Sequence, residues 1–131
     1  MKIRTGFVSN SSSSSFVLVG IALPREEYST EDQKLELAKK LGYEEEKWAY
    51  VEDFFDNPHI TGVQCYFNND DGAPEGQILV GYPVAEDYDD GSGCLASYSI
   101  DLATATKKAE GILEKLGVML PLKIYSGMRM I

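Results

Sequence analysis

The sequence predicts an α+β protein with a mainly antiparallel sheet and helices on one face of that sheet. The chain has 131 residues, which is enough for one domain. Of these residues, 44% are hydrophobic, which is typical of a folded protein and not of a disordered one. The periodicity of the apolar residues predicts the element order β-α-α-β-β-β-α-β. Without the second helix and one short strand, this is β-α-β-β-α-β, the split βαβ or ferredoxin-like order.

The first predicted strand covers residues 16–23, where apolar side chains occupy both alternating faces. A strand of this kind is typical of the centre of a sheet, and Pro24 ends it. Five consecutive serines at 11–15 come before it; they bury no apolar area and compete for backbone hydrogen bonds. We therefore expect residues 1–15 to form a Ser-rich N-terminal segment and residues 16–131 to form the single α+β domain.

Two helices are predicted to follow the first strand. Ser29 and Thr30 are N-cap candidates, and Gln33 lies three residues after Thr30, as in a capping box. Gly42 is placed to end this helix. A second helix is expected over residues 44–55, where large apolar side chains recur at helical spacing before an Asn-Pro pair.

Alternating apolar residues then predict strands over 60–67, 77–84 and 95–100. Loops rich in Asp, Asn and Gly are expected between them, at 68–74 and 87–93.

The clearest helix in the chain is predicted to begin after Asp101, an N-cap residue, and to end at Gly117. A final strand is expected near Leu122. The helix carries one regular apolar stripe, formed by Leu102, Ala105, Ala109, Ile112 and Leu116.

Charge is distributed unevenly along the chain. The sequence contains 12 Lys and Arg against 21 Asp and Glu, a formal net charge of −9. Residues 1–40 carry a net charge of +1, residues 41–106 carry −13, and residues 107–131 carry +3. Most acidic residues of the middle segment fall in predicted loops and helix ends. A negative surface of this kind attracts a basic protein surface and accelerates the encounter.

Three interpretations of the acidic middle segment remain open. It is a solvated surface that keeps the protein soluble, a docking surface for a basic protein, or a divalent-cation site. Docking is the functional hypothesis: residues 44–90 would occlude a basic surface of a partner protein, with Trp48 or Tyr88 as aromatic anchor. The residues assigned to this surface are Glu45, Glu52, Asp70, Asp71, Glu86, Asp87, Tyr88, Asp89 and Asp90.

No cofactor or metal is predicted. An EF-hand loop needs oxygen donors at fixed positions before its glycine. With Gly91 as that glycine one position holds Tyr88, and with Gly72 one holds Phe67, so neither loop fits. The G-x-G-x-x-A match that starts at Gly91 opens a strand-like run and not a helix, which is unlike a dinucleotide site.

The protein is expected to have no enzyme activity. His59 is the only histidine, so a general base would have to be His59, and Cys65, six residues later, is the nucleophile that could pair with it. The plainer interpretation is a loop histidine beside Pro58. Cys65 and Cys94 form no C-x-x-C pattern and are expected to be reduced thiols in a cytoplasmic protein.

Two classes of partner are expected to be absent. Nonspecific nucleic-acid binding depends on Lys and Arg, which are outnumbered here, so no direct nucleic-acid contact is predicted. No apolar run approaches the roughly 18 residues of a membrane helix, so no membrane contact is predicted.

Residues 6–16 read Gly-Phe-Val-Ser-Asn followed by five serines and Phe16. This string resembles the N-terminal segment of small uncharacterised proteins from bacteriophages and some bacteria. The resemblance is confined to the start of the chain and assigns no activity to any residue. It implies a phage-related origin, and with it an accessory protein that acts on a host component.

The resulting hypothesis is a small acidic accessory protein that docks on a basic surface of a host protein. The alternative is a structural component of a virus particle or of its assembly. Such a component would form homo-oligomers through strand edges and the N-terminal arm.

Overall fold

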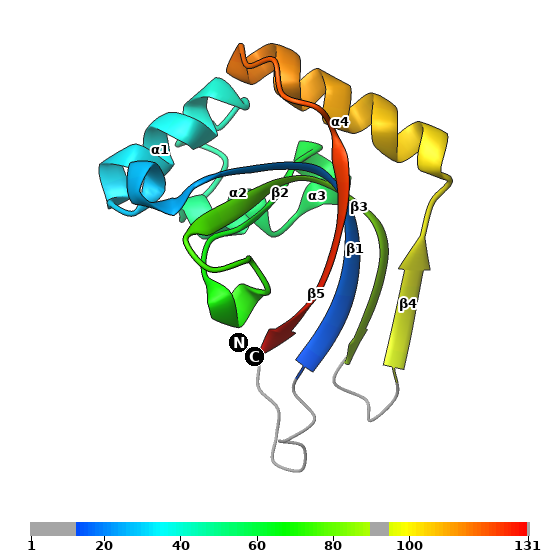
Figure 1. Ribbon diagram of the computed structural model, residues 1–131. Helices are drawn as coiled ribbons and strands as arrows, with labels where there is room; N and C mark the ends of the chain where they lie inside the picture. Colours follow the sequence, from blue (N-terminus) through cyan, green and yellow to red (C-terminus); the bar gives the residue numbers. More distant parts are fainter. Residues whose placement is uncertain (1–12, 90–94, 131) are drawn as a thin grey trace.

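A computed structural model describes residues 13–89 and 95–130 of the chain (Figure 1). The strands are β1 Ser13–Pro24, β2 Gln64–Tyr66, β3 Gln77–Asp89, β4 Leu95–Ser99 and β5 Lys123–Met130. The helices are α1 Glu31–Lys40, α2 Val51–Phe55, α3 Pro58–Thr61 and α4 Leu102–Leu116. Two 3-10 turns, η2 Arg25–Tyr28 and η3 Asn69–Asp71, complete the described elements.

The strands form one antiparallel sheet in the order β2-β3-β1-β5, with β4 also paired to β3. Since β3 is antiparallel to both β1 and β2, the latter two run parallel with β3 between them. By the same argument β3 and β5 run parallel with β1 between them. The predicted α+β class with an antiparallel sheet is confirmed, and nothing in the strand order conflicts with the predicted split βαβ order.

β1 lies inside the sheet, between β3 and β5, as its two apolar faces predict. It begins at Ser13, three residues earlier than expected, because the backbone of Ser13 and of the two following serines pairs with β5. Serines that bury little still donate and accept backbone hydrogen bonds. A register shift between Val17 and Leu18 places Pro83 of β3 opposite Leu18. A proline has no amide to offer, so an irregularity is where an inner strand tolerates it.

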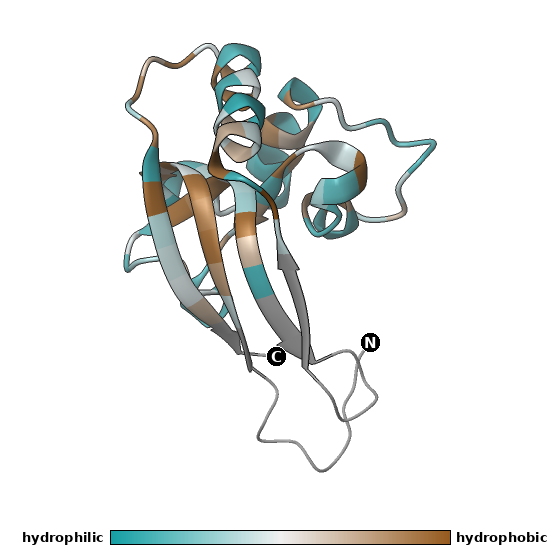
Figure 2. Ribbon diagram, turned by 90° about the vertical axis from the view of Figure 1, so that its right-hand side faces the viewer, coloured by the Kyte–Doolittle hydropathy of each residue, from teal (hydrophilic) through white to brown (hydrophobic). Residues whose placement is uncertain are grey.

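The two faces of the sheet are covered differently. On one face, Ile21 of β1 and Val80 of β3 pack against α1, α2 and α4, and hydrophobic residues concentrate where the helices cover the strands (Figure 2). On the other face, Phe16, Leu18 and Tyr66 form a second cluster under the η3 loop. Phe16 and Tyr66 stack there, with ring centroids 4.1 Å apart.

Two predicted helices are confirmed at their caps. Thr30 caps α1: its side chain accepts from the backbone N–H of Gln33, and the Gln33 side chain accepts from the backbone N–H of Thr30. Asp101 caps α4 through the backbone N–H of Thr104, and Gly117 ends that helix in the left-handed conformation, with φ of 70°.

The expected helix over residues 44–55 is wrong in extent, because only Val51–Phe55 is helical. Three consecutive glutamates repel one another, and Tyr50 takes an extended N-cap conformation with φ −134° and ψ 148°. Pro58 does not only end this stretch, since it also opens α3 as its first residue, where its missing N–H costs nothing. The strand expected over 60–67 is accordingly shortened to Gln64–Tyr66.

The acidic loop expected at 87–93 is also corrected. β3 continues to Asp89, with Asp87 paired to Ser97 of β4. The carboxylates marked a loop by composition, but pairing with β4 satisfies the backbone and extends the strand. Residues 90–94 lie outside the described residues.

Candidate functional site

Acidic residues are concentrated in the stretch that follows α1 and runs through α2. We call residues 44–56 the acidic segment; it contains six carboxylates and one lysine. Glu45 and Glu52, both assigned from the sequence, are exposed. The single cation, Lys47, is paired with Glu44 at 3.0 Å. The acidic segment therefore presents a concentrated negative charge to solvent.

Tyr50 is the exposed aromatic side chain of the acidic segment. It is 67% exposed and immediately precedes the carboxylates of α2. Trp48, by contrast, is half-buried and packs edge-on against Phe54 at 6.1 Å, and its carbonyl accepts from the Tyr43 hydroxyl at 3.4 Å. Trp48 is thus part of the packing, whereas the Tyr50 side chain is largely exposed to solvent. The sequence pattern missed this because both residues fall within a stretch that reads as helix.

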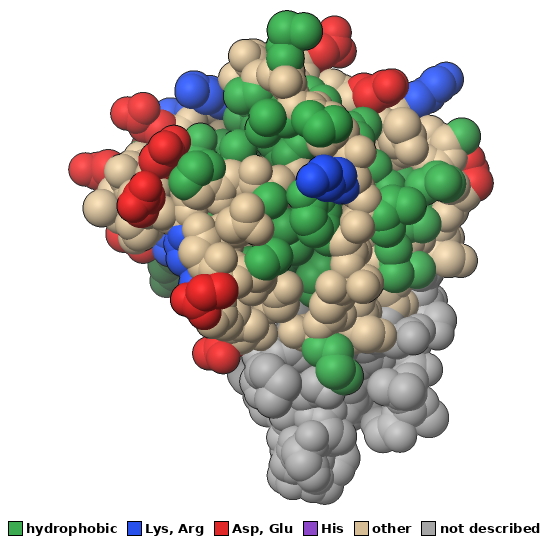
Figure 3. Space-filling view, viewed as in Figure 1, with side chains coloured by type: hydrophobic (Ala, Val, Ile, Leu, Met, Phe, Trp, Pro, Cys, Tyr) green, Lys and Arg blue, Asp and Glu red, His purple; other side chains and the backbone are tan. Residues whose placement is uncertain are grey.

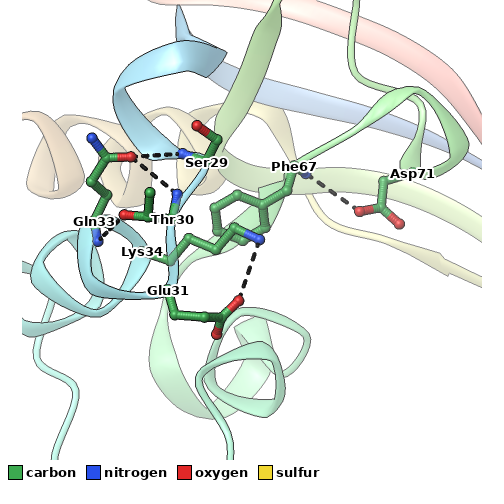
Figure 4. A network of polar contacts seen from close by, with 7 residues as sticks. All are labelled: Ser29, Thr30, Glu31, Gln33, Lys34, Phe67 and Asp71. Atoms are coloured by element: carbon green, nitrogen blue, oxygen red, sulfur yellow. Dashed lines mark hydrogen bonds and ion pairs between the residues drawn. The ribbon is translucent and has the colours of Figure 1, made fainter.

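Asp70 and Asp71 occupy η3, on the loop after β2. Asp70 is exposed, whereas Asp71 is half-buried and accepts a hydrogen bond from the backbone N–H of Phe67 at 3.3 Å (Figure 4). Asn68 caps η3 by accepting from the N–H of Asp71 at 3.0 Å. Asp71, which the sequence assigned to the docking surface, therefore helps to hold the η3 loop in place.

The same close-up shows what lies between this loop and α1. Lys34 extends over the Phe67 ring, 5.0 Å from its centroid, and its ammonium lies 3.9 Å from Glu31 (Figure 4). Phe67 also packs edge-on against Phe55 of α2 at 5.3 Å. The η3 loop, α1 and α2 are thus joined by one set of contacts, although they are distant in sequence.

Glu86 is half-buried on β3, directly across from Phe16 of β1. Gly72, the residue after Asp71, lies against the same Phe16 ring. The structure therefore brings η3 and Glu86 to one aromatic side chain, on the sheet face opposite the acidic segment.

The remaining predicted docking residues are at the end of β3. The backbone of Asp87, Tyr88 and Asp89 belongs to this strand. Their side chains, and all of Asp90, lie outside what the structure describes.

The predicted docking residues that the structure describes thus fall into two groups: Glu45 and Glu52 on the acidic segment, and Asp70, Asp71 and Glu86 near η3. Figure 3 shows carboxylates gathered along the side of the molecule that carries α1 and η3.

Hydrophobic side chains cover much of the middle of the same view, over β5 and the end of α4 (Figure 3). The apolar side chains exposed there are Met119 at 98%, Leu120 at 42%, Ile124 at 60% and Met128 at 58%.

The two residues considered for catalysis have different environments. Cys65 on β2 is 3% exposed inside the core. Burial, reinforced by the charges of Asp71 and Asp56, raises the pKa of its thiol well above the usual value, so it is held protonated. His59 is exposed on α3 and lines a surface cleft.

Within residues 13–89 and 95–130, no three His, Cys, Asp or Glu side chains are grouped as metal ligands. No helix in the same residues has the length and apolar character needed to cross a membrane.

No known protein family, curated protein or solved structure matches the chain. The functional assignment therefore depends on the surfaces themselves.

Proposed function

We propose that this protein is a binding module that docks the acidic segment, residues 44–56, on a basic surface of another protein, with Tyr50 as the central anchor. The observation that carries the proposal is Tyr50, an aromatic side chain 67% exposed among concentrated carboxylates. Tyrosine is enriched among the residues that dominate binding energy, because it supplies contact area at low entropic cost. The surrounding charge would steer a basic partner toward it.

Two further features support this assignment. The segment is held by buried aromatic contacts, since Phe54 packs against both Tyr43 and Trp48. A partner would therefore meet a preorganised surface, which lowers the entropic cost of binding. The resemblance of residues 6–16 to phage-encoded proteins is the reason to look for the partner in a bacterial host.

The test is a photocrosslinking experiment in bacterial cells. A benzophenone amino acid replaces Tyr50 in one variant and the exposed Leu102 of α4 in a control. The expected result is one crosslinked protein species from position 50 and none of that species from position 102. Capture of the same species from both positions would show that the acidic segment is not the docking surface.

Charge variants then test the mechanism with the partner so identified. Glu45→Lys with Glu52→Lys is expected to weaken its retention at low salt. Glu110→Lys with Glu114→Lys, the same charge change on exposed positions of α4, is expected to leave retention unchanged. Because exposed charges are screened by salt, the native complex should also weaken as ionic strength rises. Retention by the Glu45→Lys and Glu52→Lys variant equal to that of the native protein would remove the proposal.

A second candidate function is self-assembly, which a separate observation favours. Among the described residues, β5 ends the sheet and pairs with β1 alone, which leaves its outer backbone groups available to another strand. Ile124 and Met128 on this strand are more than half exposed. Light scattering coupled to size-exclusion chromatography should then find an oligomer of the native chain and a monomer of Ile124→Lys. A monomeric native chain would exclude this candidate.

A further inference from the structure

A cleft of about 310 Å³ lies between α3 and α4, and the proposed docking surface does not use it. One wall is α4, which contributes Lys107, Lys108 and Lys115. The opposite wall is α3 with His59. A protein with a net charge of −9 thus has three lysines at one concave site.

The lysines of the cleft are not paired with carboxylates. No Asp or Glu lines it among the described residues. In the same part of the chain, none of the three lysine ammonium groups forms an ion pair. The two acidic residues of α4, Glu110 and Glu114, border a different hollow together with Leu113.

Lys107 and Lys115 lie on one face of α4, two steps of four residues apart. Lys108 extends toward the sheet, where its ammonium lies 5.7 Å from the centroid of the Tyr82 ring. The ring and the ammonium attract each other, which restrains the Lys108 side chain.

Gly111 lies between Lys107 and Lys115 on the cleft wall. A glycine inside a helix lowers its stability relative to alanine. Neither a left-handed backbone nor tight packing requires it here, because a Cβ added at this position would meet no atom within 4 Å. Its effect on the structure is to leave the wall between the lysines without a side chain. Because Gly111 lines the cleft, a side chain at this position would take up part of its volume.

We propose that this cleft binds a small organic phosphate through Lys107, Lys108 and Lys115. A phosphoryl group carries more than one negative charge and several acceptor oxygens, which suits a site with three ammonium donors. The exposed Ile60 at the cleft gives an apolar surface for the organic part of the ligand. The volume is at the lower end for small-ligand sites, which fits a molecule of nucleotide size.

The surrounding charge favours a small anion over a nucleic acid. A phosphate polymer would extend beyond the cleft and meet the acidic residues of the middle of the chain, which carry −13 over residues 41–106. A small anion experiences mainly the charges within a Debye length, about 8 Å at physiological salt. The surface that such an anion would contact carries three lysines and no carboxylate among the described residues.

Isothermal titration calorimetry at constant ionic strength tests the proposal with pyrophosphate, ADP and adenosine as probes. Saturable binding of ADP and pyrophosphate, with no binding of adenosine, is expected. Tighter binding of ADP than of pyrophosphate would show that the apolar rim contributes, whereas equal binding would show that the phosphoryl groups suffice. Binding of neither phosphate at millimolar concentration would overturn the proposal.

Variants separate this site from nonspecific attraction. Lys107→Gln with Lys115→Gln is expected to weaken binding by about tenfold or more. Lys39→Gln with Lys40→Gln removes the same charge from exposed positions on α1 and is expected to leave binding unchanged. Equal weakening in both pairs would mean that no defined site exists.

Gly111→Leu provides a steric test that does not change charge. Leucine favours a helix over glycine, so the variant should unfold at a higher temperature and yet lose binding. Binding of ADP by this variant with native affinity would show that the ligand lies elsewhere. Because the variant is expected to be more stable, its loss of binding would not be an effect of misfolding.

Discussion

Single residues at the centre of the sheet set how closely its strands approach. Gly20 of β1 and Gly81 of β3 lie directly opposite each other. A Cβ on Gly20 would meet the carbonyl oxygen of Val80 and lie 2.7 Å from the Cα of Gly81. The obstacle is backbone on both sides, so no side-chain rotation can relieve it. These two positions accept only glycine at the observed strand spacing.

Gly20→Ala or Gly81→Ala is therefore expected to destabilise the protein by roughly 1–3 kcal/mol, the usual cost of overpacking an interior. Denaturant unfolding followed by circular dichroism measures this change. Gly111→Ala is the matched control, because its added Cβ meets nothing, and it is expected to stabilise the protein by about 0.5–1 kcal/mol. A Gly20→Ala variant as stable as the native protein would contradict the close strand approach.

Cys65 is a second residue whose chemistry follows from its surroundings. Its burial raises the pKa of the thiol, and the thiolate is the reactive form. In a Cys94→Ser background, Cys65 is expected to react with a thiol reagent at neutral pH only after denaturant is added. Absorbance after addition of a chromogenic disulfide measures the reaction. Fast reaction of the native protein would show that the core around β2 is open.

At the scale of elements, side-chain caps mark where α1 and α4 begin. The Asp101 carboxylate accepts from the Thr104 hydroxyl at 2.8 Å and from the Thr104 backbone N–H at 3.0 Å. These hydrogen bonds, that of the hydroxyl first, lower the pKa of Asp101 from its ordinary value of 3.8. Because the folded pKa is the lower one, the ionised cap stabilises the folded state above pH 3.8. That contribution is lost as the pH falls through the folded pKa.

Asp101→Asn tests this linkage. Asparagine keeps an acceptor at the N-cap but does not titrate in this range. The native protein is expected to be the more stable of the two above pH 3.8 and to lose that advantage at lower pH. Urea unfolding at several acidic pH values measures the difference. A difference that stays constant with pH would show that the Asp101 carboxylate does not titrate differently on folding.

A second element-scale feature is the link between η2 and the loop after β2. The Arg25 guanidinium donates to the carbonyls of Pro74 and Gln77 and to the Asn69 side chain, each at 2.9 Å. This one side chain ties both ends of the η3 loop to the end of β1. Asp70 and Asp71 are therefore presented on a loop that is held in place, and not on a freely moving one.

At the scale of the whole molecule, charge and apolar surface are divided between different regions. Residues 25–75, which include η2, α1, α2, α3 and η3, contain 14 acidic and five basic residues. Residues 102–131, which include α4 and β5, contain two acidic and five basic residues. The exposed apolar side chains Met119 and Ile124 belong to the second region. Repulsion between copies at neutral pH opposes contact through this apolar face.

Lowering the pH toward the pI, near 4.5, is expected to promote self-association through the apolar face, since the net charge of −9 is then neutralised. Static light scattering over a pH series measures this. Met119→Lys with Ile124→Lys should suppress the association, and Lys39→Gln with Lys40→Gln should not. Equal association of native protein and the Met119→Lys and Ile124→Lys variant would place the contact elsewhere.

Much of the fold was readable from local patterns. The capping box at Thr30 and the Asp101 cap each depend on residues three positions apart, so the sequence displays them directly. The apolar run of β1 is also a local pattern: apolar side chains on both of its faces predict a central strand. The prediction of a helix over residues 44–55 was wrong. Aromatic residues at helical spacing also occur in a segment without regular structure whose aromatic side chains pack on one another.

For the candidate sites, what the sequence determined is clearly separate from what the tertiary structure decided. The sequence by itself determined that carboxylates concentrate in the middle of the chain and lysines near its end. Only the tertiary structure decided that Tyr50 is exposed while Trp48 packs against Phe54, and that α3 faces the lysines of α4 across a cleft. The physical reason is that charge and helix caps are local properties of the chain. Exposure and clefts depend on packing between segments far apart in sequence, which local periodicity does not encode.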